Sequence, residues 1–383
     1  MRGLLLTVVS LILAVAVAVS VGWHLLYARL ATPLAPLATV ASQAASGERQ
    51  SLTHVMIGRP EATQPTPKAV MDALAAAKLV ETSPLIDWYA QHMFHGERLV
   101  PGEYALSPSM SLVEQLAKIE RGDIVLRSVS IQPGATREDV VGALVAQGLC
   151  DADALVALIR DASFASSLGL KAPSLDGFLY PDVYTLPRGL APRRLLSTLV
   201  ARFKTEIPDE TFRDAARLGY EPVLVVAVAS VLERADLPAA ELRLFARVVY
   251  NRLAVGLPLG RGVNAFSGLP ASIDEHAVTV ERRTRRVGKK ARRRRRAPAL
   301  SSPSASPSSS PSSSSSLPLS SRLLPIGNPG RRAVVAAANP ATTDAIYFVA
   351  RDDGTHVFCA DRECFEAARR RWGALPGAVE SRP

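Results

Sequence analysis

The segment from Val225 to Leu253 constrains the fold more than any other part of the chain. It reads VVAVASVLERADLPAAELRLFARVVYNRL, an apolar helical run that ends on one carboxylate, Glu233, and is followed by a second patterned segment. A carboxyl group at the end of an apolar helix is either a solvated helix end or, if it faces inward, a proton donor. Apolar surroundings favour the neutral acid and let such a group donate a proton near neutral pH.

The N-terminal run from Leu4 to Val21 contains no charge and continues to Tyr27. It therefore has the eighteen or so apolar residues that a membrane span needs. A cleaved signal peptide behind Arg2 is the alternative, although the run is longer than the apolar region of such peptides. With no second span in the sequence, the rest of the chain is expected on one side of the membrane, outside the cytoplasm.

The net charge of +10 arises in one place. Residues 281–296 contain eleven Lys or Arg and one acid, whereas the remainder of the 383-residue chain balances 34 basic against 34 acidic residues. This basic run is either a solvated tract or a docking segment for phosphate-rich polymers or anionic headgroups. The balance elsewhere argues against a specific nucleic-acid binder.

Apolar periodicity, caps and turn residues predict an α+β chain long enough for two modest domains. After a linker over residues 30–53, strands and helices alternate to about residue 150, and the chain then becomes mainly helical. Strands are expected at 53–58, 102–107 and 124–134, and helices at 67–79, 85–94, 111–122, 136–148, 191–206, 208–218, 222–234 and 238–254. A hairpin turned at 353–354 and a final helix at 360–372 complete the pattern.

The three cysteines do not have the spacing of a metal site. Cys359 and Cys364 are close enough to pair in an oxidising compartment, and Cys150 stands apart. Two thiols in a sequence do not establish a bridge, so the pairing stays open. We expect neither a metal nor a cofactor.

Several blocks resemble the endolytic murein transglycosylase (YceG-like) family. The phrase ASVLER, then Glu241, FARVVYNRL and GLPL are similar to the core of that family. Further blocks follow the family's order: ERLVPGEYALSPSMSLVEQLAKIERGDIVLRSVSIQPGAT at 97–136, LDGFLYPDVYTLPRG at 175–189, and PIGNPGRRAVVAAANPATTDAIYFVARDDGTHVF at 325–358. Together they cover most of the chain from about residue 54.

The resemblance implies a domain plan for the α+β chain. It comprises a cytoplasmic tip and anchor at 1–29, the linker at 30–53, a LysM-like module at 54–150 and a catalytic domain at 151–270 and 323–383, with a low-complexity insertion at 271–322. LysM-like modules bind N-acetylglucosamine polymers, but a small domain of this pattern also serves as a spacer. Trp88, Tyr89 and Tyr104 are the candidates for an aromatic platform.

The resemblance also implies a lytic transglycosylase acting on nascent peptidoglycan glycan strands, with peptidoglycan synthases as partners, in the bacterial inner membrane with most of the chain periplasmic. Glu233 is the expected general acid and then base. Glu241, Tyr250, Asn251 and Asn328 are the expected substrate-binding residues. Structural alternatives are a surface salt bridge for Glu241 and a turn for Asn328, which precedes Pro-Gly. Asn251 could hydrogen-bond an acetamido group, whereas the neighbouring Arg252 could pair with an acid and stabilise the fold.

The chain departs from the family pattern between residues 260 and 324. After GLPL it reads GRGVNAFSGL, which keeps Gly268 and Leu269 but lacks the family's polar residues. Arg-rich and Ser/Pro-rich low complexity follows over 282–321 and cannot pack a core. A catalytically impaired cell-wall-binding protein of the same fold is therefore the alternative function, and a pair of compensating frame shifts is a hypothesis for the origin of the tract. Translating the gene in its other frames tests this hypothesis, because absence of the missing segment there contradicts it.

Overall fold

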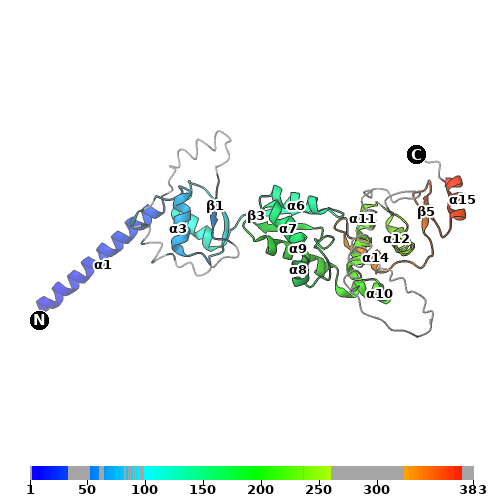
Figure 1. The fold of residues 1–383 in the computed structure, drawn as a ribbon. Coiled ribbons are helices and arrows are strands. Elements are labelled where there is room, and N and C mark those ends of the chain that lie inside the picture. Colours follow the sequence, from blue (N-terminus) through cyan, green and yellow to red (C-terminus); the bar gives the residue numbers. More distant parts are fainter. Residues whose placement is uncertain are drawn as a thin grey trace, which may run out of the picture. The chain divides into compact units, whose positions relative to one another are not determined.

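The computed structural model describes residues 2–32, 52–59, 64–81, 99–235, 237–259 and 323–372, with isolated positions between 83 and 94. The expected insertion at 271–322 and most of the expected linker at 30–53 lie outside these residues. The chain forms two compact units: the first comprises 1–129, 146–150 and 184–191, and the second comprises 130–145, 151–183 and 192–383. Helices and small two-stranded sheets in both units confirm the α+β class (Figure 1).

The first unit begins with helix α1, Arg2–Leu30. Strand β1 (Thr53–Ile57) pairs antiparallel with β2 (Gly102–Leu106), with Val55 opposite Tyr104. Helices α3 (Pro67–Ala76) and α5 (Leu112–Glu120) supply apolar faces that are buried with this sheet. Helix α5 lies within the helix expected at 111–122, and Ser111 caps it in a reciprocal capping box with Glu114.

Strand β2 also carries a buried carboxylate. Glu103 is 2% exposed and lies 2.9 Å from Arg127, 3.4 Å from Arg188 and 3.6 Å from His54. Arg127 belongs to β3 (Leu126–Ser130), which pairs with β4 (Val183–Pro187), and Arg188 follows β4 directly. The Val125 amide donates to the Glu103 carbonyl oxygen at 2.6 Å. The buried Glu103 thus links β2 to β3 and to the residue after β4 through ion pairs.

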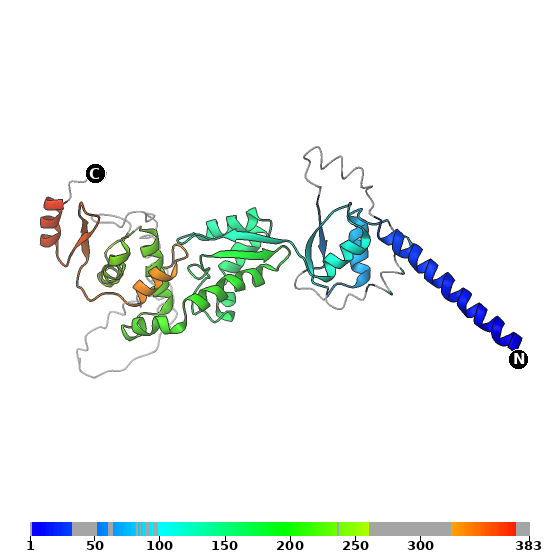
Figure 2. The same cartoon turned by 180° about the vertical axis from the view of Figure 1, so that it is seen from behind.

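The second unit is built around a helix that is apolar on every side. Helix α11 (Pro222–Arg234) begins with Pro222 in its first turn, and residues 223–232 are all buried. It packs against α12 (Leu242–Val255) and α14 (Arg331–Ala338), which lie beside it in both ribbon views (Figures 1 and 2). The other helices of the unit are α6 (Arg137–Ala146), α7 (Ala152–Ile159), α8 (Ala162–Ser167), α9 (Pro192–Glu206), α10 (Arg213–Arg217) and the short 3-10 helices Asp209–Phe212 and Ala239–Glu241.

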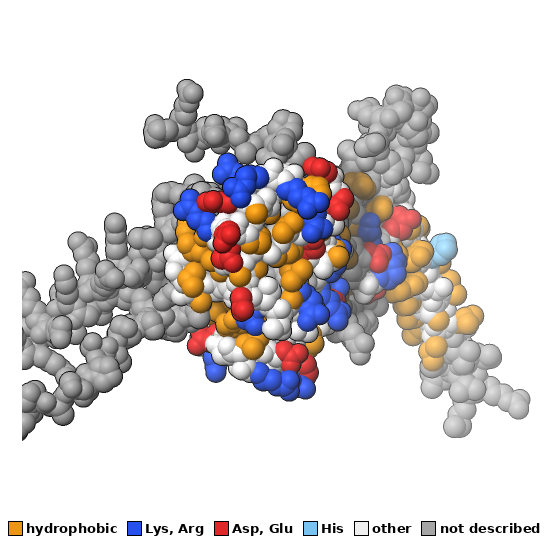
Figure 3. Space-filling view, turned by 90° about the vertical axis from the view of Figure 1, so that its right-hand side faces the viewer, with side chains coloured by type: hydrophobic (Ala, Val, Ile, Leu, Met, Phe, Trp, Pro, Cys, Tyr) orange, Lys and Arg blue, Asp and Glu red, His pale blue; other side chains and the backbone are white. Residues whose placement is uncertain are grey.

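The C-terminal part of the second unit is the predicted hairpin and helix. Strands β5 (Tyr347–Ala350) and β6 (His356–Cys359) pair antiparallel, and α15 (Arg362–Trp372) packs on them. Cys359 and Cys364 form a disulfide that ties β6 to α15, so the pairing left open by the sequence is made. Figure 3 shows basic and acidic side chains interspersed over one face of the described residues.

Helix α1 forms where the sequence predicts it, and its side chains from Ser10 to Leu25 are exposed. Leu11, Leu13 and Val15 are 66%, 67% and 56% exposed. Within the described part of the chain, no single helix has both the length and the apolar character to cross a membrane; Ser10–Leu25 is a shorter apolar helix. One bent pair of helices, Asp209–Arg217 and Pro222–Arg234, could cross a membrane as judged by length and composition only.

Candidate functional site

Glu233 lies in the last turn of α11, where the buried helix leaves the core. Its side chain is half-buried, directly after the fully buried Val231 and Leu232. Two loops, 132–136 and 325–330, meet at this helix end, and a third, 176–180, contacts the 325–330 loop and Val226 earlier in the helix. All three come from sequence blocks that resemble the family, and all belong to the second unit. The fold therefore gathers separate motifs around one carboxyl group.

Asn328 joins the three loops. It is 1% exposed, its Nδ2 donates to the Ala135 carbonyl oxygen at 3.0 Å, and its Oδ1 accepts from the Leu179 amide at 3.0 Å. Its backbone amide also donates to Ala135 at 2.8 Å, and its carbonyl oxygen accepts from the Gly134 amide at 2.8 Å. The described contacts of this carboxamide are thus with main chain, and the expected contact with substrate remains a prediction.

Glycines allow these loops to approach each other closely. A Cβ atom on Gly327 would lie 2.6 Å from the Gly134 carbonyl oxygen. A Cβ atom on Gly177, whose φ is +84°, would lie 2.7 Å from both Pro325 and Val226 of α11. Real side chains do not tolerate such distances, so both positions need glycine for space, and Gly177 also needs it for its positive φ.

The carboxylate of Glu233 has one fixed oxygen. Its Oε2 accepts a hydrogen bond of 3.0 Å from the backbone amide of Gly330, the residue that caps α14. Gly134 lies against the side-chain stems of Glu233 and Arg234, and Arg234 Nη1 donates to the Gly134 carbonyl oxygen at 3.4 Å. Within the described ranges, Glu233 Oε1 has no hydrogen-bond or ion-pair partner.

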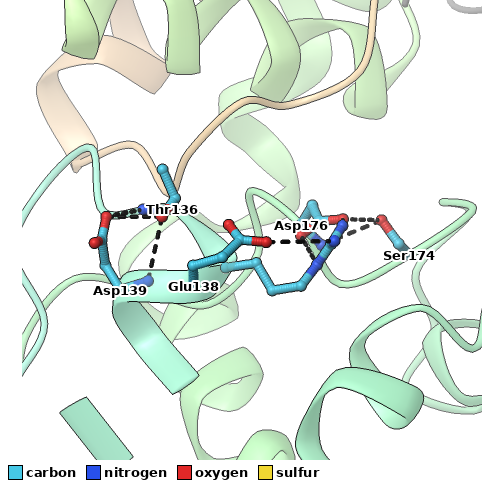
Figure 4. Close-up of polar contacts among 6 residues, drawn as sticks. Thr136, Glu138, Asp139, Ser174 and Asp176 are labelled. Atoms are coloured by element: carbon cyan, nitrogen blue, oxygen red, sulfur yellow. Dashed lines mark hydrogen bonds and ion pairs between the residues drawn. The ribbon is translucent and has the colours of Figure 1, made fainter. Parts of the chain in front are cut away.

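A second carboxylate lies near Arg234. Asp139 caps α6 together with Thr136: the Thr136 amide donates to Asp139 at 2.9 Å, and the Asp139 amide donates to the Thr136 hydroxyl at 3.2 Å (Figure 4). The pKa of Asp139 is lowered by the hydrogen bonds from the Thr136 amide and hydroxyl and by the positive charge of Arg234. Asp139 is therefore an ionised group that stabilises a helix start.

An ion pair fixes the 176–180 loop to the same helix. The Arg137 guanidinium forms two hydrogen bonds to Asp176, which also accepts from the Ser174 hydroxyl at 2.8 Å (Figure 4). These bonds raise the pKa of Arg137, so its charge is permanent. Arg137 and Thr136 together hold the start of α6 between two of the loops around Glu233.

The other expected binding residues lie on α12 or, for Glu241, directly before it, and they make fold contacts. Glu241 accepts a hydrogen bond of 3.0 Å from the His356 amide, and its Oε2 lies 2.7 Å from His356 Nδ1. Both side chains are 14% exposed. Tyr250 is buried, which raises the pKa of its hydroxyl, and it donates to the Ala337 carbonyl oxygen at 2.9 Å. Asn251 Nδ2 donates to the carbonyl oxygens of Thr343 and Ala345 at 3.0 and 2.9 Å.

The sequence did not single out Gly134, Gly327 or Gly330, although each stands in a Gly-containing turn of the QPGAT and PIGNPG segments. Pro-Gly dipeptides signal turns. Nothing in them shows that the two turns pair with each other. Across the described residues, no group of three or more His, Cys, Asp or Glu is arranged to hold a metal ion.

Comparison with known proteins finds one family whose pattern includes these motifs. The model of the YceG-like family matches residues 62–262 and 323–371, which together make up well over half of the chain. The chain belongs to the YceG-like family. The interruption of the match falls in the segment where the sequence departs from the family pattern.

Two relatives from Streptococcus pneumoniae are endolytic murein transglycosylases. The protein of serotype 2 strain D39 is 25% identical over 241 residues, and that of strain R6 is 24% identical over 242 residues. Each match covers 55% of this chain and 42% of the relative, so the chain spans less than half of either relative. A crystal structure of a YceG-like protein from Listeria monocytogenes aligns over 83% of this chain and 99% of its own, at 19% identity and a TM-score of 0.41.

Proposed function

We propose that the protein is an endolytic peptidoglycan lytic transglycosylase in which Glu233 is the general acid and then the general base. The observation that carries the proposal is the position of this carboxyl group. It ends a buried helix, one oxygen is held by the Gly330 amide, and the other has no protein partner in the described part of the chain. Family membership and the names of the two streptococcal relatives support the reaction class.

The proposed reaction needs one acid and no water. Protonated Glu233 donates its proton to the oxygen of the β-1,4 bond between N-acetylmuramic acid and N-acetylglucosamine, and the bond from C1 to that oxygen breaks. The C6 hydroxyl oxygen of the muramic acid forms a bond to C1, and its proton returns to the Glu233 carboxylate. The products are a 1,6-anhydro end and a free 4-hydroxyl. A hydrolase would instead require a second carboxylate flanking the bond.

The binding roles of Glu241, Tyr250, Asn251 and Asn328 remain part of this proposal. They rest on the resemblance, since the described contacts of all four are within the fold. In the same proposal residues 54–150 are a LysM-like module that holds the glycan. Trp88, which is 43% exposed and stacks on His92 at 5.0 Å, supports that role, whereas Tyr104 is buried and Tyr89 lies outside the described residues.

We further propose that α1 anchors the protein in the bacterial inner membrane with the two units outside the cytoplasm, where peptidoglycan synthases supply nascent strands. The exposed apolar side chains of α1 support an anchor, because such a surface needs an apolar cover. The Cys359–Cys364 disulfide supports an oxidising compartment.

Digestion of purified sacculi by the full-length protein tests the proposed reaction. Mass spectrometry of the products should show anhydro-muropeptides, and Glu233→Gln should abolish them because a carboxamide is too weak an acid to protonate the glycosidic oxygen. Binding of sacculi without any anhydro product from the wild type would overturn the enzymatic proposal. That result would favour the catalytically impaired wall-binding alternative, which the interrupted family match also suggests.

A further inference from the structure

We propose that the backbone amide of Gly330 fixes the orientation of Glu233, so that Oε1 is the atom that gives and takes the proton, and that Asn328 is the positioning residue for this amide. This inference rests on the proposed function and extends it. The hydrogen bond from Gly330 to Glu233 Oε2 joins residues 97 positions apart in the sequence.

The geometry explains why this amide is free to act. Gly330 has φ −78° and ψ 170° and caps α14, whose own hydrogen bonds run from later amides back to earlier carbonyl groups. The first amides of a helix have no partner inside that helix. The Gly330 amide therefore points out of the helix start, where Glu233 accepts it, and its position at the N-terminal end places the positive side of the helix dipole at the carboxylate.

This arrangement distinguishes the two oxygens chemically. The carbonyl oxygen of a neutral carboxylic acid is a better acceptor than its hydroxyl oxygen, so the hydrogen bond from Gly330 to Oε2 favours the proton on Oε1. When the proton leaves, negative charge spreads over both oxygens, and the Gly330 amide is already in place to stabilise it. Donors aligned in advance with developing charge are among the largest contributions to enzymatic rate.

The 325–330 loop that carries this amide is held on both sides of Asn328. On one side, the Ile326 amide donates to the Ser230 hydroxyl of α11 at 3.1 Å. On the other side, the Asn328 carboxamide forms hydrogen bonds to Ala135 and Leu179, and Gly327 packs closely against Gly134. Asn328 thus acts on the reaction through the loop, two residues away from the amide that contacts Glu233.

A pair of substitutions at one position tests the role of the amide. Gly330→Pro removes the N–H group, and its fixed φ is compatible with the observed −78°. Gly330→Ala keeps the N–H group, and its methyl group would lie 3.4 Å from Glu233 Oε2. We expect Gly330→Pro to lower kcat about 100-fold relative to Gly330→Ala, with KM close to that of Gly330→Ala.

Asn328→Leu, which removes both side-chain hydrogen bonds at similar volume, should lower kcat in the same way. The binding role that the proposed function gives to Asn328 would add a rise in KM to this loss of kcat. Equal kcat values for Gly330→Pro and Gly330→Ala would overturn the inference, as would an effect of Asn328→Leu confined to KM.

A spectroscopic test does not depend on activity or on either Gly330 substitution being stable. The sequence contains four Pro–Gly pairs, with glycines at 102, 134, 330 and 377. Labelling the full-length protein in detergent micelles with carbonyl-¹³C proline and ¹⁵N glycine leaves these four amides visible in a carbonyl-filtered spectrum. The Gly330 amide proton should move upfield in Glu233→Leu, which removes the acceptor, while that of Gly102 in the first unit should stay in place. An unmoved Gly330 resonance contradicts the inference.

The two proposals fail in different ways. If Glu233→Gln retains wild-type release of anhydro-muropeptides, the proposed function is wrong whatever the Gly330 resonance does. If Glu233→Gln is inactive while Gly330→Pro matches Gly330→Ala, the proposed function stands and the orientation of the carboxyl group by Gly330 is wrong.

Discussion

Arg127 and Arg188 both pair with Glu103, and they should differ in what they contribute to stability. Arg127 is 28% exposed and lies 2.9 Å from the carboxylate, whereas Arg188 is 51% exposed and lies 3.4 Å away. Removing the close partner leaves a buried charge uncompensated, so Arg127→Met should lower the free energy of unfolding by about 3 kcal/mol. Arg188→Met should lower it by less than about 1 kcal/mol. Urea denaturation measures both, and equal losses would contradict the distinction.

The same carboxylate predicts a direction for pH dependence. Burial raises the pKa of Glu103, but the hydrogen bond and charge of Arg127, the hydrogen bond of Arg188 and the charge of His54 together bring it below its ordinary 4.5. A folded-state pKa below the unfolded one stabilises the fold above the unfolded pKa, and this contribution is lost as the pH falls through the folded value. The unfolding free energy of Glu103→Gln should therefore fall less than that of the wild type between pH 6 and pH 3. An equal acid slope would contradict this prediction.

Asn251 tests whether a residue expected to bind substrate serves the fold instead. Its amide donates to two main-chain carbonyl oxygens, and Asn251→Ala would leave both without this donor. The free energy of unfolding should fall by about 2 kcal/mol, measured by urea denaturation. A stable variant with a raised KM would support direct binding of the glycan and contradict the structural reading.

At the scale of elements, the close approach of two loops makes a matched pair of glycine substitutions informative. Gly327→Ala places a methyl group 2.6 Å from the Gly134 carbonyl oxygen, which forces the loops apart and should cost about 2 kcal/mol. Gly142→Ala is the control: this residue lies inside α6 with nothing within 4 Å of the added Cβ, so it should stabilise the protein by about 0.5–1 kcal/mol. Thermal unfolding compares them, and a neutral Gly327→Ala would show that the contact is not needed.

The disulfide joins two elements that have a small core of their own. Cys359 ends β6 and Cys364 lies in the first turns of α15, five residues further along the chain. Closing so short a loop should contribute about 2 kcal/mol by restricting the unfolded chain. Reduction by dithiothreitol should therefore lower the Tm of the wild type and leave that of the Cys359→Ala/Cys364→Ala variant unchanged. A variant Tm equal to that of the oxidised protein would contradict the contribution.

The helices and strands could be predicted from the sequence because their signals are local. The contacts around Glu233 could not, because they join residues far apart in the chain. Ser111 and Thr136 cap their helices within three residues, and Pro222 marks the start of α11. By contrast, the amide that contacts Glu233 is 97 residues away, and the carboxamide of Asn328 reaches a carbonyl group 193 residues away. No local pattern in QPGAT or PIGNPG indicates that their backbones pair. The sequence supplied Glu233 itself, through an apolar run that ends on one acid and through resemblance.

At the scale of the whole molecule, α1 is a helix whose side chains from Ser10 to Leu25 are left uncovered by the fold. Leu13 and Val17 are 67% and 56% exposed, in the middle of the apolar stretch Ser10–Leu25. If this helix anchors the protein, the full-length wild type should remain in the membrane pellet after alkaline carbonate extraction. Leu13→Lys with Val17→Lys should release it, because a lysine near the centre of a membrane helix costs about 3 kcal/mol.

The control for this experiment keeps the stretch apolar. Ala14→Leu with Ala18→Leu adds apolar surface at neighbouring positions, so it should leave the protein in the pellet. The N-terminal sequence of the purified wild type separates the anchor from the alternative of a cleaved signal peptide. A mature chain that begins after residue 21, recovered in the soluble fraction, would contradict the anchor. A cleaved signal peptide would still export the disulfide and the site around Glu233 from the cytoplasm.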